Sequence, residues 1–355
     1  MNARHAVCAT LVICCAGAVV IGSAGDSIEK FETQQTEKLM GVKISAFRRK
    51  GEKQDVLQFK DLAPLQFTIS EQKFEGPRVR YWFEHEKTVK ATSKKNEEFA
   101  AYCGSPKDAI ILPGHNFKSD LTNRRHRYGT LFDFEFYPSD VVVGKMVKDK
   151  IAPLLFFRDV GTYGDCHALA IDEGGNAHLV VSDLHRENSG RVKTYWAIGD
   201  LTSKKWEDLY LIEHVPGGLS ASSHPKAAST KDTVHVVLRT TTYPDKTGYV
   251  DRLTHYPWKK GEKFGKSTVI YEGPQLHTFE IAACRASNTL VVVYPSKEGV
   301  FVLANQNGAW RGSRLLPEEI RKECDVDVAL VGENTFRIRV ATTKDRQFEI
   351  KLKDR

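Results

Sequence analysis

One stretch of the sequence, from Ala168 to Val181, reads ALAIDEGGNAHLVV. Its first part is a short apolar run of the kind that forms a packed β-strand. The central residues, Asp172 to Asn176, are of the types that tight turns favour. A second apolar run follows directly, so the stretch predicts a β-hairpin.

The same strand–turn–strand pattern returns three times towards the end of the sequence. The further copies run from Pro225 to Leu238, from Glu280 to Tyr294 and from Asp325 to Val340. Measured between the turn residues Asn176, Asp232, Asn288 and Asn334, the spacings are 56, 56 and 46 residues. Each of the first three hairpins is followed by another predicted strand pair with tryptophan, namely Trp196 and Trp206, Trp258, and Trp310. A unit of roughly 40 to 55 residues therefore recurs along the chain.

Units with four strands each predict an all-β fold, a β-propeller of four-stranded blades. A small twisted sheet cannot bury both of its faces alone, whereas radial packing of several sheets covers them. At this repeat length we expect about seven blades, with six as the alternative, in a single domain over residues 25–355. A β-sandwich is the main structural alternative, but it does not explain the repeated spacing.

The start of the sequence is typical of a secretory signal over residues 1–24. Arg4 and His5 precede an apolar run from Ala6 to Ile21, and small residues follow at Gly22 to Ala24. An uncleaved anchor is the alternative, although the run is short for a membrane span. We therefore expect a secreted or periplasmic protein that is monomeric and has no membrane contact after cleavage. Just beyond, Ser27 to Met40 shows the best helical pattern in the chain.

The charge of the sequence favours an acidic partner over nucleic acid. There are 52 Lys and Arg against 45 Asp and Glu, a formal net charge of +7. The basic pairs are scattered, which is typical of a solvated surface, and attraction to an anionic polysaccharide is the functional alternative. No nucleic-acid recognition motif is present, so nucleic acid is not an expected partner.

Cysteine usage leaves two possibilities open. After cleavage, four cysteines remain: Cys103, Cys166, Cys284 and Cys324. In an oxidising compartment they permit two disulfides in three possible pairings, and buried free thiols are the alternative. Cys284 and His277, with His255 or Cys166, offer a weaker set of zinc ligands, and no Cys-x-x-Cys pair supports it. We expect no cofactor, with a structural zinc as the minor alternative.

The first hairpin resembles the repeat of sialidase-like propellers, and more closely the neuraminidase-repeat propeller family that includes ulvan lyases. Members of that family carry a His before the first strand, an Asp-x-x-Gly turn, a His on the second strand and a His at its end. The matching positions here are His167, Asp172, His178 and His185. A full sialidase Asp-box is absent from the chain.

The resemblance extends over Gly164 to Gly273. The family's Tyr-Pro-Arg/Lys-Phe run matches the four residues that begin at His224, and the later family Arg matches Arg239. Two departures stand out, because His224 replaces the family's Tyr and Ala168 replaces a favoured Asn. Either change is consistent with a different substrate or with a lost activity.

The resemblance implies cleavage of a uronate-containing glycan by β-elimination. That reaction needs a group that neutralises the carboxylate, a base for the adjacent proton and an acid for the departing oxygen. Arginine suits the first role and histidine the others. We expect the catalytic site to be formed by His167, His185, His224 and Arg239, because each of these residues flanks a strand of the repeat.

Further residues are expected to contact the substrate or to stabilise the fold. The candidate substrate contacts are Tyr163, Tyr195, Tyr243 and Arg125. His178 and His235 lie inside apolar strands at equivalent hairpin positions, so we interpret them as packed structural residues.

These residues predict a secreted carbohydrate-active propeller, with a polysaccharide lyase acting on an acidic glycan as the leading hypothesis. A non-catalytic propeller that binds glycans or proteins is one alternative. A sialidase-like glycosidase is another, and it needs two carboxyl groups across a sugar-sized gap. Fold alone does not decide among the three.

Overall fold

The computed structural model contains β-strands and one short 3-10 helix, η1 (Phe59–Asp61), in the part that it describes. The described residues are 38–39, 41–46, 54–74, 88–103, 126–127, 135–136, 139–148, 150–160, 166–183, 192–215, 222–242, 248, 250–261, 263–274, 276, 278–317, 324–342 and 345–353. The expected signal over residues 1–24 therefore lies outside them. No described helix is long and apolar enough to cross a membrane.

Five sheets repeat one plan, an antiparallel series of strands that follow each other along the chain. Blade 1 contains β6 (Thr88–Thr92), β7 (Glu98–Cys103), β10 (Ser139–Val147) and β11 (Lys150–Val160). Blade 2 contains β12 (His167–Ile171), β13 (Asn176–Asp183), β14 (Val192–Asp200) and β15 (Lys205–Val215). Outside the blades, β8 (His126–Arg127) pairs with β9 (Glu135–Phe136).

The other three blades carry the remaining predicted repeats. Blade 3 contains β16 (Ser222–Ser229), β17 (Thr233–Thr242), β18 (Val250–Lys259) and β20 (Thr268–Gly273), with β19 (Lys263–Phe264) beside β18. Blade 4 contains β21 (Glu280–Cys284), β22 (Thr289–Ser296), β23 (Gly299–Gln306) and β24 (Ala309–Leu316). Blade 5 contains β25 (Asp325–Gly332), β26 (Thr335–Ala341) and β27 (Arg346–Leu352), completed by β5 (Phe67–Gln72) from near the N-terminus.

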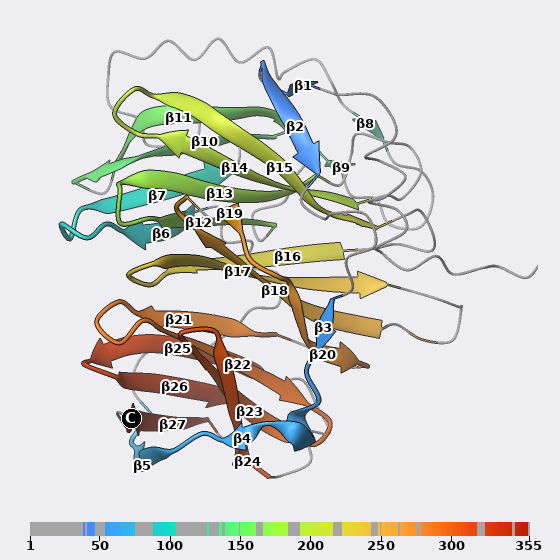
Figure 1. The fold of residues 1–355 in the computed structure, drawn as a ribbon, viewed down its shortest axis with the longest axis vertical. Helices are drawn as coiled ribbons and strands as arrows, with labels where there is room; N and C mark the ends of the chain where they lie inside the picture. The colour runs from blue at the N-terminus through green and yellow to red at the C-terminus, as the bar shows by residue number, and fades with distance from the viewer. Residues whose placement is uncertain are drawn as a thin grey trace, which may run out of the picture.

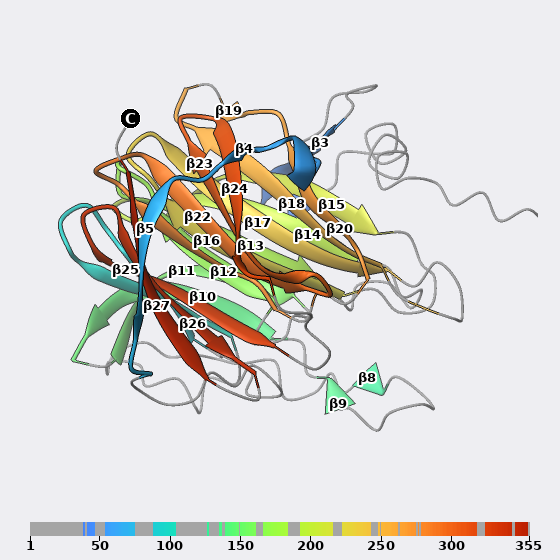
Figure 2. The same ribbon diagram turned by 90° about the horizontal axis from the view of Figure 1, so that it is seen from below.

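The blades are arranged around a common axis, as the repeat predicts. The first strands of successive blades, β6, β12, β16, β21 and β25, contact one another in that order. Arg285, just after β21 of blade 4, donates hydrogen bonds to the carbonyls of Thr92 (2.8 Å) and Ile171 (3.0 Å). Those carbonyls end the first strands of blades 1 and 2, so the strands of non-neighbouring blades converge at one point. Figure 1 shows the sheets following one another down the molecule, and Figure 2 shows them from below. The protein is therefore a β-propeller.

Both faces of the inner strands are covered, which explains their unbroken apolar runs. All eight residues of β22 are buried. Val291 and Val293 pack in a cluster with blade 5, whereas Leu290 and Val292 pack in a cluster with blade 3. Alternate side chains point to opposite faces of a strand, so a blade between two others needs apolar residues at every position.

The four predicted hairpins occupy equivalent places, because each joins the first and second strands of blades 2 to 5. Gly175, Asn288 and Asn334 have positive φ in their turns, a conformation that Gly and Asn tolerate best. The described residues form five blades, fewer than the six or seven that the repeat length predicts. The N-terminal segment accounts for part of the difference, since it adds strands to other blades instead of forming its own.

This N-terminal segment, which we call the strap, comprises the described residues between 38 and 72. It begins with β1 (Lys38–Leu39), so the predicted helix is wrong where it overlaps the described residues. Three strands then pair in parallel with the outer strands of blades 2, 3 and 4, namely β2 (Val42–Ala46), β3 (Asp55–Val56) and β4 (Ala63–Pro64). The last strand, β5, pairs with β27. In Figure 1 the strap is the blue segment that passes the sheets in turn.

The cysteines follow the second expectation from the sequence. Cys103, Cys166, Cys284 and Cys324 are all buried free thiols. Burial, with Asp325 nearby, raises the pKa of Cys324 to about 12, which keeps this thiol protonated and unreactive near neutral pH.

Candidate functional site

Two of the predicted catalytic residues form a pair on blade 3. His224 in β16 and Arg239 in β17 are directly opposite each other in the antiparallel register. Residues paired in this way have their Cβ atoms on one face, about 5 Å apart. Val237, two residues before Arg239, packs in a cluster with blade 4, so this face of the sheet looks towards blade 4. Both His224 and Arg239 are partly exposed.

Neighbouring contacts fix the position of Arg239. Its Nη1 donates to the carbonyl of Leu276, which lies between blades 3 and 4 (3.3 Å). The backbone N–H of Leu276 donates in turn to Asp251 Oδ2 (2.9 Å). Asp251 also accepts a hydrogen bond from the Thr241 hydroxyl, and it is almost completely buried. These hydrogen bonds hold in place the segment whose carbonyl accepts the bond from Arg239. Sequence motifs did not reveal Asp251, because no position of the family motif matches it.

The same face of β16 carries a further cation. Lys226 Nζ lies 2.6 Å from Glu280 Oε1 at the start of β21 in blade 4. Lys226 therefore ties the two blades together two residues from His224. Glu280 is occupied by this ion pair and Asp251 by its two donors, so neither carboxyl group is set aside for glycosidase chemistry.

His167 is separated from this pair. It lies at the start of β12, two residues before Leu169, which packs in the cluster between blades 1 and 2. The ring is buried, and its Nε2 is 3.3 Å from the carbonyl of Ala101 in blade 1. His167 and His224 are at the same ends of neighbouring first strands, but their side chains face different seams of the propeller.

Of the predicted substrate contacts, only Tyr195 can be assessed. Tyr195 is 1% exposed and packs against Phe157 in the core, which does not fit a role in substrate binding. Four other predicted site residues lie outside the described residues: His185, Tyr163, Tyr243 and Arg125. Their roles stay predictions.

The two histidines interpreted as structural are buried in hydrogen-bond networks. Trp196 Nε1 donates to His178 Nδ1 (3.1 Å), so the other nitrogen, Nε2, carries the proton that faces Asp172 Oδ2 (3.4 Å). Burial alone would raise the pKa of Asp172, but hydrogen bonds from His178 and Asn176 outweigh it and lower the pKa to about 2. His235 is likewise buried at the equivalent position of blade 3.

No metal site is formed by the described residues. No group of three or more His, Cys, Asp and Glu side chains in these ranges is arranged to hold a metal ion. The suggested zinc ligands come from different blades, with Cys166 in the segment leading into blade 2, His255 in blade 3 and Cys284 in blade 4. His277 lies outside the described residues, so the cofactor expectation stays a prediction.

Comparisons with known proteins give only distant likenesses. No protein-family model matches the sequence, and no curated protein matches it. Among solved structures, one similar protein is an ulvan lyase of a polysaccharide lyase family, bound to a fragment of glucuronic acid and sulfated rhamnose. Its TM-score is 0.44 at 9% identity, and the match covers 79% of this chain and 70% of the other. The WD40 domain of Toxoplasma gondii coronin has a TM-score of 0.31 at 8% identity, covering 83% and 90%. The propeller assignment rests on the sheet order and the strand contacts described above.

Proposed function

We propose that the protein is a carbohydrate-active propeller that binds a uronate-containing glycan at His224 and Arg239 and cleaves it by β-elimination. The observation that carries this proposal is the direct cross-strand pairing of the two residues. A planar guanidinium can pair with a carboxylate through two parallel hydrogen bonds. An imidazole on the same face is then close to the carbon next to that carboxylate.

The reaction assigns one role to each residue. Arg239 neutralises the uronate carboxylate and so makes the adjacent C–H proton more acidic. His224 accepts that proton, and the released electron pair forms a carbon–carbon double bond. The C–O bond to the neighbouring sugar breaks, and the departing oxygen takes a proton from a general acid. We assign that acid to Tyr243, which follows β17 in the sequence and whose phenol O–H can donate a proton.

A non-catalytic glycan-binding propeller is the second candidate. One observation favours it, because His167 faces a different seam and its ring contacts the backbone of blade 1. One residue that was predicted to act as acid or base therefore does not lie beside His224 and Arg239. Arginine and histidine on one face still suit the binding of an acidic sugar.

The two candidates are separated by incubating the purified chain with a panel of uronate polysaccharides. Ultraviolet absorbance of the unsaturated product follows cleavage, and calorimetry follows binding. We expect Arg239→Gln to lower turnover by about 100-fold or more, because it removes the group that neutralises the carboxylate, and we expect His224→Gln to do the same by removing the base.

Arg252→Gln is the matched control. Arg252 lies on the next strand, β18, and forms an ion pair with Glu272 instead. This variant should cleave at the wild-type rate. Binding without unsaturated product would favour the non-catalytic propeller, release of reducing ends without that product would favour a glycosidase, and absence of any binding would overturn the proposal.

A further inference from the structure

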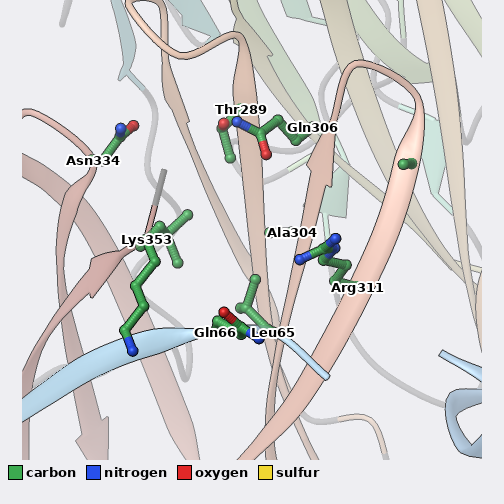
Figure 3. Close-up of a pocket in the computed structure, with 10 residues that line it drawn as sticks. Leu65, Gln66, Thr289, Ala304, Gln306, Arg311, Asn334 and Lys353 are labelled. Carbon is green, nitrogen blue, oxygen red and sulfur yellow. The ribbon is translucent and has the colours of Figure 1, made fainter. Parts of the chain in front are cut away.

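A small pocket opens between blades 4 and 5, at the end of the blades where the first hairpins turn (Figure 3). Blade 4, blade 5 and the strap all contribute to its wall. The lining residues are Leu65, Gln66, Thr289, Ala304, Gln306, Ala309, Arg311, Asn334, Leu352 and Lys353. Its cavity volume is small, about 20 Å³. The pocket shares no residue with the His224–Arg239 pair, which lies near the other end of the strands.

The charge of this lining has one sign. Arg311 and Lys353 are cationic, and none of the ten residues carries a carboxylate. The other polar side chains are three amides and the hydroxyl of Thr289, and amide N–H groups donate to anionic oxygens. In Figure 3, Arg311 extends into the pocket from one side and Lys353 lies on the other.

Arg311 makes no side-chain hydrogen bond or ion pair with any other described residue. Its Nε is shielded from solvent and has no hydrogen-bond partner in that part of the chain. Three residues further along β24, Arg314 does form an ion pair with Glu298. A buried donor on a permanently charged group costs folding free energy when it has no partner. The strap contributes to this burial, because β4 pairs with β24 at Ala63 and Arg311.

The apolar lining strengthens the attraction to an anion. Leu65, Ala304 and Leu352 are buried side chains of the wall, so part of the lining shared with Arg311 is apolar. Charge–charge attraction rises as the surrounding dielectric constant falls. A cavity of about 20 Å³ suits one compact charged group better than an extended polymer.

We propose that this pocket binds a single small oxyanion, a sulfate or carboxylate group, between Arg311 and Lys353. The group is either a free inorganic anion or a substituent of an acidic saccharide. In both cases Arg311 supplies the oriented donors, and Lys353 supplies a second positive charge from the end of blade 5.

The proposal is tested by calorimetric titration of the full chain with sodium sulfate at low ionic strength, where charge screening is weak. We expect Arg311→Gln to weaken sulfate binding by about tenfold or more, and Lys353→Gln to weaken it to a smaller extent, because Lys353 is exposed. Lys231→Gln removes one charge from an exposed turn at the same end of blade 3 and should leave the affinity unchanged. Cleavage of uronate glycans, which the proposed function places at His224 and Arg239, should proceed at the wild-type rate in Arg311→Gln, so failure of this proposal is distinguishable from failure of the proposed function.

A second titration uses a sulfated disaccharide. Tighter binding of the disaccharide than of sulfate assigns the group to a saccharide, and the reverse assigns it to a free ion; both support the pocket. No binding of either probe by the wild type, or equal binding by the wild type and Arg311→Gln, overturns the proposal. If Arg311→Gln does not fold, the test uses Lys353→Gln instead. An unchanged affinity of Lys353→Gln for sulfate would then contradict the proposal.

Discussion

Two buried histidines, His235 and His255, share a hydrogen bond inside blade 3. Thr230 donates its hydroxyl proton to the carbonyl of Thr233, so it accepts a hydrogen bond from His235 Nε2 (3.2 Å). The unprotonated Nδ1 of His235 then accepts from His255 Nε2 (2.9 Å). His235 must therefore be neutral for this chain of hydrogen bonds to form, because its Nδ1 has to accept the bond. Burial, with Lys259 nearby, lowers the pKa of His235 to about 3, and burial lowers the pKa of His255 well below its usual value.

This arrangement predicts loss of stability in mild acid. Below about pH 6.5 the unfolded chain binds protons at both histidines, whereas the folded chain does not. The free energy of unfolding should then fall by up to about 1.4 kcal/mol per pH unit for each histidine. Asp172, with its pKa of about 2, keeps its charge over this range and adds little to the slope.

The measurement is chemical unfolding of the wild type and His255→Phe at pH 7 and pH 5. His255→Phe removes one titrating ring and keeps an aromatic ring beside Trp310. Its stability should depend less on pH than that of the wild type. Equal dependence in both proteins would show that these rings do not control the acid response.

Sequence reasoning reached some of the individual residues and missed others. His178 and His235 were predicted to be structural from their place inside apolar strands, and their burial confirms it. His224 and Arg239 are neighbours because the hairpin register pairs them, which the strand lengths allow one to predict. His167 lies at a strand end, and no pattern in one strand reveals which seam its side chain faces. The pocket at Arg311 depends on three distant segments, and local patterns carry no signal for it.

At the scale of elements, the hairpins were predictable and the strap was not. Each hairpin combines two apolar strands with a turn of Gly, Asn or Asp, all within about 15 residues of sequence. β1 pairs with its neighbour β2, but the other strands of the strap pair with partners about 165 to 285 residues away, and several are two residues long. Apolar side chains of the strap nevertheless complete the seams, as Ile44, Phe59 and Leu65 join three different clusters.

Close contact at Gly312 makes the strap testable. A Cβ at this position would lie 2.6 Å from Leu303 Cδ2, 2.9 Å from Phe59 Cε2 and 3.0 Å from Leu62 Cδ1. We expect Gly312→Ala to push η1 away from blade 4 and to lower the free energy of unfolding by about 1–3 kcal/mol. Hydrogen exchange of residues 54–65 should become faster.

Gly248→Ala is the control for this substitution, because a Cβ at Gly248 meets no atom within 4 Å. Its exchange rates over residues 54–65 should equal those of the wild type. Unchanged exchange in Gly312→Ala would mean that the strap does not depend on this contact.

At the scale of the whole molecule, the repeat spacing predicted the propeller architecture. Spacing of 56, 56 and 46 residues marks equivalent turns, and these turns do lie in successive blades. The described residues form five blades, and the count of six or seven for the whole chain stays a prediction. The fold brings His224 and Arg239 to one seam between blades 3 and 4, and it leaves His167 at the seam between blades 1 and 2. The proposed chemistry consequently rests on fewer residues than the family resemblance implies.

The central claim is that the seam beside His224 and Arg239 binds an acidic sugar. A crystal structure of the full chain with a bound uronate oligosaccharide tests it most directly. We predict the uronate carboxylate within hydrogen-bonding distance, about 2.7–3.2 Å, of the Arg239 guanidinium, with the His224 ring beside the adjacent carbon. Density for the oligosaccharide at another seam or surface, with water alone beside Arg239 and His224, would contradict the account.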